Sequence, residues 1–231
     1  MPMQSAGDLI PGTGRAKRGP AKMCLRLYDD YNMMNVMQSK PSRKQITHDR
    51  IVEVASRAIR RAGTNGVGVA DLMKEAGLTH GGFYAHFESR DALVVEAMQR
   101  AWQDSSGALR DAMARQVEKG ETAFGALVQA YLHDSNLDRI DCGCMVAALA
   151  SEMPRLNESG LAEARRRVSA LVELVRSTLP DKADPALAEG LAATLVGALQ
   201  MARVFGGEPG RSLLARTRQQ LLSRFEPVSP D

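Results

Sequence analysis

The side chains best suited to chemistry stand close together between residues 79 and 90. They are hydrogen-bonding or charged groups, in the order Thr79, His80, Tyr84, His86 and Arg90. Two histidines can ligate a metal ion, but His80 and His86 are spaced for neither one helical face nor a closed zinc site. We therefore expect no metal here and interpret the group as donors of hydrogen bonds and positive charge to a polyanion.

An enzymatic reaction would need a set of residues that the sequence does not supply. We find no glycine-rich phosphate loop, no metal cluster, and no serine or cysteine nucleophile with a positioned base. His133 stands beside Asp134, apart from other candidates. We predict a protein that is not an enzyme and needs no cofactor.

Two of the three cysteines, Cys142 and Cys144, stand just before a predicted helix, and the third is Cys24. The positive end of a helix dipole favours the reactive thiolate form, so an electrophile or oxidant is one candidate signal. The alternative is that both are small buried apolar side chains. An odd cysteine count without a secretory signal favours the cytoplasm, and no apolar run is long enough to span a membrane.

Short helices must position the 79–90 group. Apolar residues recur at spacings of three and four from Thr47, which predicts a first helix ending at Gly63. A second helix is predicted over residues 69–76 with Gly77 as its stop, and Thr79 is placed to cap a third. Two short helices joined by a tight glycine-containing turn have the dimensions of a helix-turn-helix.

Spacing within the third helix, which we expect to end near residue 87, separates a buried face from an exposed one. Phe83 and Phe87 are four residues apart and share a face, which we expect to pack on Leu72 and Ile51. His80, Tyr84 and His86 then project elsewhere. Ser89 can cap a fourth helix, and capped helix N-termini offer free N–H groups to phosphate oxygens.

Charge is distributed unevenly along the chain. Residues 1–90 carry 14 Lys and Arg against 8 Asp and Glu, whereas the remainder carries 16 against 19. A basic first third on a mildly acidic body suggests that the N-terminal part meets a polyanion.

The run from Gly66 to Leu93 resembles the DNA-binding signature of the TetR family of transcriptional regulators. This resemblance implies an all-α fold, a homodimer, and a third helix that enters the major groove of a palindromic operator. It places at or near DNA the residues Lys44, Thr79, His80, Gly81, Gly82, Tyr84 and His86, with Arg90 clamping a phosphate. Gly68 departs from the pattern, since many members have a capping Ser or Thr there.

The remaining chain reads as helices that form a regulatory and dimerisation core. Residues 185–205 and 210–225 are expected to pair as a hairpin, with Leu191, Leu195, Val196, Leu199, Leu213, Leu214, Leu221 and Leu222 completing a four-helix seam between subunits. A hairpin buried within one subunit explains these residues equally well. Large apolar residues are either core or the lining of a ligand pocket, namely Trp102, Phe124, Tyr131, Met145, Leu149, Met153, Met201 and Phe205.

We therefore expect a disordered extension over 1–45, a DNA-binding domain over 46–92, a helical regulatory domain over 93–226 and a tail over 227–231. The predicted function is that of a sequence-specific DNA-binding regulator, by default a repressor. A small apolar ligand, or an electrophile acting on Cys142 or Cys144, would release it from DNA. The alternative is a helical protein–protein adaptor that does not bind specific DNA.

Overall fold

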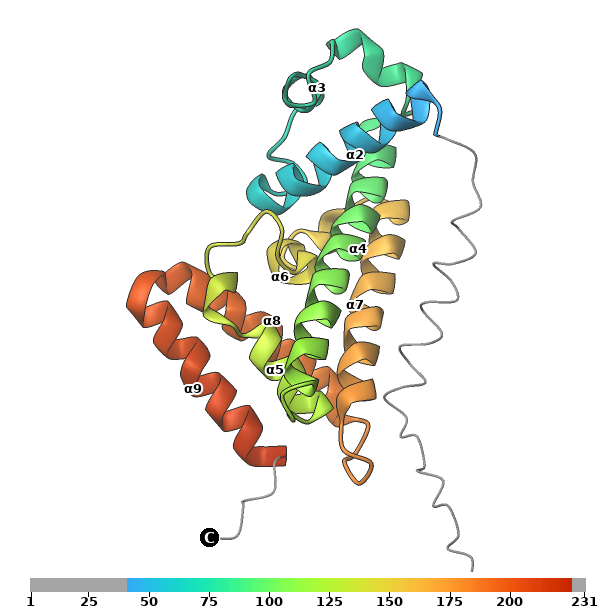
Figure 1. The fold of residues 1–231 in the computed structure, drawn as a ribbon. Helices are drawn as coiled ribbons and strands as arrows, with labels where there is room; N and C mark the ends of the chain where they lie inside the picture. The colour runs from blue at the N-terminus through green and yellow to red at the C-terminus, as the bar shows by residue number, and fades with distance from the viewer. Residues whose placement is uncertain (1–40, 226–231) are drawn as a thin grey trace, which may run out of the picture. The chain divides into compact units, whose positions relative to one another are not determined.

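The N-terminal helices form where the sequence predicts them, with one shifted boundary. The computed structural model describes residues 41–225 (Figure 1). Helix α2 spans Arg43–Ala62 and begins four residues earlier than expected, because the Ser42 hydroxyl accepts a hydrogen bond from the Gln45 N–H at 3.1 Å. Residues 43–45 are thus helical. Residues 1–40 of the predicted extension, among them Cys24, and the predicted tail lie outside the described residues.

All regular elements of the described residues are helices, which confirms the all-α prediction. After α2 come α3 (Val69–Glu75), the 3₁₀ helix η1 (His80–Ala85), α4 (Arg90–Val117), α5 (Ala123–Tyr131), η2 (Asp134–Asn136), α6 (Met145–Leu149), η3 (Met153–Arg155), α7 (Glu158–Thr178), α8 (Leu187–Phe205) and α9 (Gly207–Phe225). None of the helices between residues 41 and 225 is long and apolar enough to cross a membrane.

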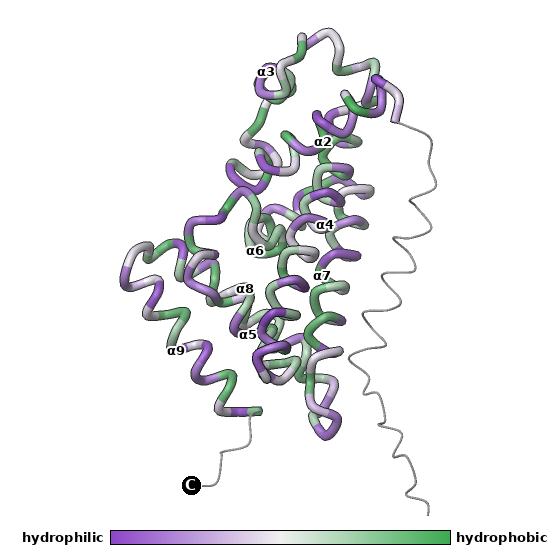
Figure 2. Tube along the Cα trace, in the orientation of Figure 1, coloured by the Kyte–Doolittle hydropathy of each residue, from purple (hydrophilic) through white to green (hydrophobic). Residues whose placement is uncertain are grey.

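The long helix α4 connects the two ends of the described structure. Near its start it packs on α2, and further along it contacts α5, α6 and α7 (Figure 1). Ala97, Met98 and Ala101 of α4 are fully buried within one continuous hydrophobic core that reaches from Ile51 to Leu221. In Figure 2 hydrophobic and hydrophilic residues alternate along the traces of α4 and α7, as expected for helices with one buried side. A shift of α4 would therefore be felt by both α2 and the helices of the body.

The last two helices form the predicted hairpin, but their leucines face their own subunit. Gly206 and Gly207 join α8 to α9 with φ values of 63° and 45°, which a glycine adopts at little cost. The predicted seam leucines are buried or packed against the core of this chain, including Leu191, Leu195, Leu199, Leu214 and Leu221 at no more than 7% exposure. The five buried leucines are covered within their own subunit, as the alternative of a hairpin buried in one subunit expects, while Val196, Leu213 and Leu222 are half-buried.

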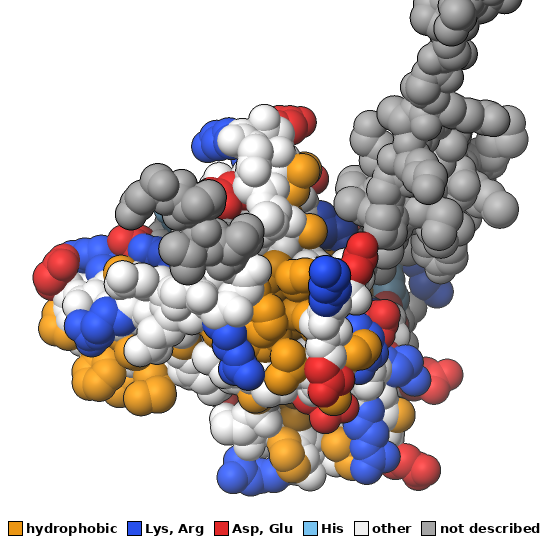
Figure 3. All heavy atoms as spheres, turned by 90° about the horizontal axis from the view of Figure 1, so that it is seen from below, with side chains coloured by type: hydrophobic (Ala, Val, Ile, Leu, Met, Phe, Trp, Pro, Cys, Tyr) orange, Lys and Arg blue, Asp and Glu red, His pale blue; other side chains and the backbone are white. Residues whose placement is uncertain are grey.

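A different face of α8 is exposed. Met201, Val204 and Phe205 are 56%, 87% and 59% exposed, and beside them no neighbouring atom lies within 4 Å of a Cβ built on Gly190 or Gly197. Apolar side chains also reach the surface in patches on the face seen in Figure 3, interspersed with Lys, Arg, Asp and Glu. Scattered apolar residues are common on protein surfaces, but three large ones within five residues of a helix are a contiguous patch.

Candidate nucleic-acid interface

The turn between α3 and η1 has the geometry that the sequence predicts. Gly77 has a φ of 70°, a left-handed conformation that favours glycine. The Gly77 N–H donates to the Lys74 carbonyl at 2.9 Å, and the Leu78 N–H donates to the Met73 carbonyl at 2.8 Å. These bonds close the C-terminus of α3 and direct the chain into η1, which confirms Gly77 as the stop of the second helix.

The third helix is shorter and more tightly wound than expected. Residues 80–85 form a 3₁₀ helix, whereas the sequence predicts a helix from Thr79 to near Phe87. Gly81 and Gly82 explain the difference, because each glycine costs about 1 kcal/mol relative to alanine in an α-helix. Thr79 occupies the N-cap position of η1, as predicted, but its side chain makes no capping hydrogen bond. Its exposed hydroxyl is free to meet a partner.

Two phenylalanines fix the orientation of η1, as predicted. Phe83 and Phe87 are 1% and 3% exposed in the core that also contains Ile51 and Leu72, and their ring centroids lie 5.4 Å apart. Tyr84 lies one position along from Phe83 and is 72% exposed. The exposed residues from 79 to 85 are Thr79, His80, Gly81, Tyr84 and Ala85, while Gly82 is half-buried. The buried rings thus present a polar, glycine-lined surface outward.

His86 faces α2 more than it faces solvent. Its ring lies 6.2 Å from the ring of His48, and its buried Nδ1 has no hydrogen-bond partner among residues 41–225. Burial lowers the pKa of His86, and the neighbouring His48 and Lys44 lower it further. Lys44 is exposed on the first turn of α2, so the fold brings together two predicted DNA-contacting residues that are far apart in sequence.

Arg90 is engaged within the protein. The Ser89 hydroxyl caps α4 by accepting from the Ala92 N–H at 3.1 Å, as predicted. From the first turn of that helix, the half-buried Arg90 guanidinium donates to the carbonyl oxygen of Thr64. At the start of α3, Gly68 occupies the N-cap without a side-chain hydrogen bond. The phosphate contact of Arg90 stays a prediction.

The sequence did not predict the contacts by which the N-terminal helices α2 and α3 join the remaining helices, α4 to α9. The Glu152 carboxylate accepts from the Thr64 N–H at 2.7 Å and from the Thr64 hydroxyl at 2.8 Å. The Arg60 side chain is 3% exposed and donates to the carbonyls of Ala101 and Gly143, each at 3.4 Å. The single available signal was an arginine among the apolar residues of the first helix, since a buried arginine must find acceptors.

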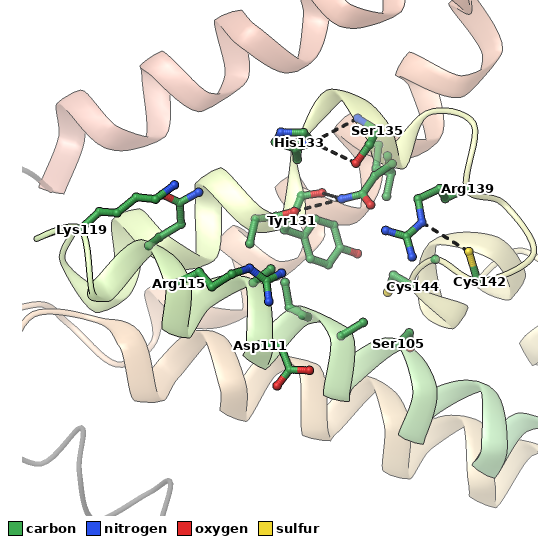
Figure 4. A pocket seen from close by; sticks show the side chains of 18 residues that line it. Ser105, Asp111, Arg115, Lys119, Tyr131, His133, Ser135, Arg139, Cys142 and Cys144 are labelled. Atoms are coloured by element: carbon green, nitrogen blue, oxygen red, sulfur yellow. Dashed lines mark hydrogen bonds between the residues drawn. The ribbon is translucent and has the colours of Figure 1, made fainter.

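Three of the predicted sensor residues line a pocket of about 460 Å³ (Figure 4). Tyr131, Cys142 and Cys144 contribute to its wall. Trp102, Met145 and Leu149 lie instead in the hydrophobic core and do not line this pocket. Both described cysteines are half-buried free thiols, and the Arg139 Nε donates to the Cys142 Sγ at 3.4 Å.

Comparisons with known proteins support this arrangement. A family model described as bacterial regulatory proteins, tetR family, matches residues 51–97. A TetR-family transcriptional regulator from Agrobacterium tumefaciens is 24% identical with a TM-score of 0.64, covering 79% of this chain and 98% of its own. A TetR regulator from Legionella pneumophila has 19% identity, a TM-score of 0.64, and coverage of 82% and 100%. One from Chloroflexus aurantiacus has 21% identity, a TM-score of 0.61, and coverage of 78% and 94%.

The chain matches none of the curated proteins with which it was compared. The structural likenesses show a common fold, and the family match covers the helices that carry the polar group of residues 79–86. Residues 51–97 thus match the model of bacterial regulatory proteins, tetR family, and the described helices share the fold of TetR-family transcriptional regulators.

Proposed function

We propose that this protein is a homodimeric repressor that binds a palindromic operator and is released by a small-molecule or thiol-reactive signal. The observation that carries the proposal is the outer surface of η1, where Tyr84 and His80 are exposed above the buried Phe83. With Gly81 and Gly82, this surface lets backbone approach a groove closely, since no Cβ holds the helix away. Lys44, Thr79, His86 and Arg90 are the flanking contacts.

We assign residues 46–92 to the DNA-binding domain and residues 93–226 to the regulatory domain, in a protein that works in the cytoplasm. Two recognition elements must meet successive major grooves about 34–36 Å apart, so a regulator of a palindrome needs a partner subunit. The exposed α8 patch of Met201, Val204 and Phe205 is the surface that supports dimerisation through the last two helices. The open Gly190 and Gly197 permit another helix to approach closely.

The signal is proposed to act on the pocket beside α6. Three predicted sensor residues, Tyr131, Cys142 and Cys144, share its wall. The two thiols favour a reactive compound as a second kind of signal, because both are free, half-buried and close to basic side chains.

Selection of DNA from a random pool by the purified full-length protein tests the proposal. The winning sequence is then titrated with protein at increasing salt concentrations. A palindromic consensus bound by dimers, with affinity falling steeply as salt rises, is the expected result because several phosphates are contacted. If folded protein enriches no sequence, specific DNA binding is refuted and the helical protein–protein adaptor becomes the better interpretation.

A further inference from the structure

The pocket beside α6 has the size of a small-molecule site. Its volume of about 460 Å³ falls within the range of roughly 300–1,000 Å³ common for ligand pockets. It lies between α4, the end of α5, the loop of residues 132–144 and α8 (Figure 4). The enclosing segments come from four different parts of the chain, so the pocket exists only in the folded protein.

Positive charge dominates the rim of the pocket. Arg115, Lys119 and Arg139 line it, and none of the three forms an ion pair with any residue between 41 and 225. Asp111 is the one carboxylate among the lining residues, and the exposed His133 is held by Ser135. Elsewhere the arginines of this chain are commonly paired, as Arg166 and Arg167 are with Glu163. The rim therefore carries an excess of positive charge that favours an anion.

A buried hydroxyl group without an oxygen or nitrogen partner lies in the same wall. Tyr131 is 2% exposed, and its hydroxyl has no oxygen or nitrogen partner among the described residues, with only the Cys144 thiol, a weak hydrogen-bonding group, beside it. In Figure 4 the ring lies between the side chains of Arg115 and Arg139, with its oxygen on the Arg139 side. Burial, followed by the nearby Cys144, raises the pKa of Tyr131 well above its usual value, so the hydroxyl keeps its proton. An unsatisfied buried donor is costly and points to an acceptor that a ligand supplies.

Part of the remaining wall is apolar, next to the polar side chains of Ser105, Gln116 and Asn136. Ala108, Leu109 and Ala112 of α4 lie on one side, and Leu199 of α8 and Ala130 of α5 complete it. Inorganic phosphate would leave this surface uncovered, whereas a hydrocarbon group would bury it favourably. The lining therefore favours a ligand that has an anionic group at one end and a hydrocarbon group at the other.

We propose that the pocket binds a small monocarboxylic acid in its ionised form. The carboxylate accepts a hydrogen bond from the Tyr131 hydroxyl and is held by the guanidinium groups of Arg139 and Arg115, because their planar forks match carboxylate geometry. The hydrocarbon part lies against Leu109 and Leu199. This inference rests on the proposed function for its regulatory meaning, which is release from the operator, but the binding itself is independent of DNA.

Calorimetric titration of the full-length protein tests the site, with octanoate and benzoate as probes at millimolar concentration and octanol and benzyl alcohol as uncharged analogues. At least one acid is expected to bind, and its alcohol is expected to bind at least about tenfold more weakly. Tyr131→Phe and Arg139→Gln should each weaken binding of the acid by about tenfold. Arg165→Gln, on the exposed face of α7, is the matched control and should leave the affinity unchanged.

A loss of acid binding in Tyr131→Phe would not be caused by misfolding of this variant. Because the Tyr131 hydroxyl has no oxygen or nitrogen partner within the described structure, Tyr131→Phe should melt at or above the temperature of the parent protein. Failure of both acids to bind, equal binding of acid and alcohol, or undiminished binding by the two pocket variants would each overturn the proposed site. Operator affinity measured without any acid tests the proposed function separately. Failure of the proposed acid-binding site can therefore be distinguished from failure of the proposed DNA-binding function.

Discussion

The Arg60 guanidinium at the end of α2 donates to the carbonyl oxygen of Gly143, the residue between the two pocket cysteines, at 3.4 Å. The same nitrogen donates to Ala101 of α4 at 3.4 Å. A movement of the Cys142–Cys144 segment would therefore act directly on α2, which packs against α3 of the proposed DNA-binding unit. A ligand that prefers one position of this segment would shift the balance between two orientations of the N-terminal helices.

Arg60→Met is expected to uncouple the pocket from DNA binding. Methionine fills the space of the aliphatic stem but leaves the carbonyls of Ala101 and Gly143 without their donor, so the free energy of unfolding should fall by about 1–3 kcal/mol in urea titrations. Operator affinity without ligand should stay within a few fold of the parent protein, while release by a pocket ligand is lost. Arg57→Met, on the exposed face of α2, is the control. Undiminished release by Arg60→Met would contradict this coupling.

Adjacent residues of η1 should separate DNA affinity from stability. Tyr84→Ala removes an exposed side chain and should weaken operator binding by about tenfold or more, with an unfolding free energy within about 0.5 kcal/mol of the parent. Phe83→Ala removes a buried ring and should cost about 3–5 kcal/mol. Fluorescence anisotropy with labelled operator and urea unfolding measure the two effects. An unchanged affinity in Tyr84→Ala would remove this residue from the interface.

A charge on the exposed face of α8 should break the dimer. Val204→Glu places a carboxylate at the most exposed of the large apolar residues, and burying it unpaired in a subunit interface would be strongly unfavourable. Light scattering after size exclusion should show monomers, and operator affinity should fall with them. Val168→Glu, at an exposed valine of α7, should stay dimeric. A dimeric Val204→Glu protein would place the subunit interface elsewhere.

If a thiol-reactive compound is the signal, modification of Cys142 or Cys144 should release the protein from its operator. A mild alkylating agent should release operator DNA from the parent protein, because an added group on Cys142 or Cys144 occupies the pocket beside Gly143. Cys142→Ser should diminish this response if Cys142, which accepts a hydrogen bond from Arg139, is the more reactive thiol. Mass spectrometry of the labelled protein identifies the modified residue. Labelling of both thiols without operator release would assign them a packing role.

The lowered pKa of His86 predicts that acid destabilises the protein. Burial is the main cause, and the charges of His48 and Lys44 add to it, so the folded state binds a proton less readily than the unfolded chain. As pH falls below about 6.5 the unfolded state takes up this proton first, and stability falls until the folded-state pKa is reached. His86→Gln should flatten the dependence of unfolding free energy on pH in this window. His80→Gln, at an exposed position, should leave the slope intact.

Local residue order was sufficient to predict the turn between α3 and η1 and the buried face of η1. Gly77, Phe83 and Phe87 lie within eleven residues, and their roles follow from the left-handed turn and the helical spacing of four. The 3₁₀ conformation of η1 was less predictable. Gly81 and Gly82 indicate that an α-helix is weakened here, but not which conformation replaces it. The residue order also predicted both N-cap positions, but not that Ser89 makes its capping hydrogen bond while Thr79 does not.

Contacts between distant residues were decided by the tertiary structure alone. An apolar spacing shows that Leu191, Leu195 and Leu199 share a face of α8, but not whether their own subunit or another covers it. Likewise, Arg60 and Gly143 are 83 positions apart, and only packing of α2 and α4 on the loop before α6 brings them together. The sequence determined the helices and their faces because those depend on neighbours along the chain. Tertiary packing decided the pocket, its charge and its link to α2 because these depend on which faces meet.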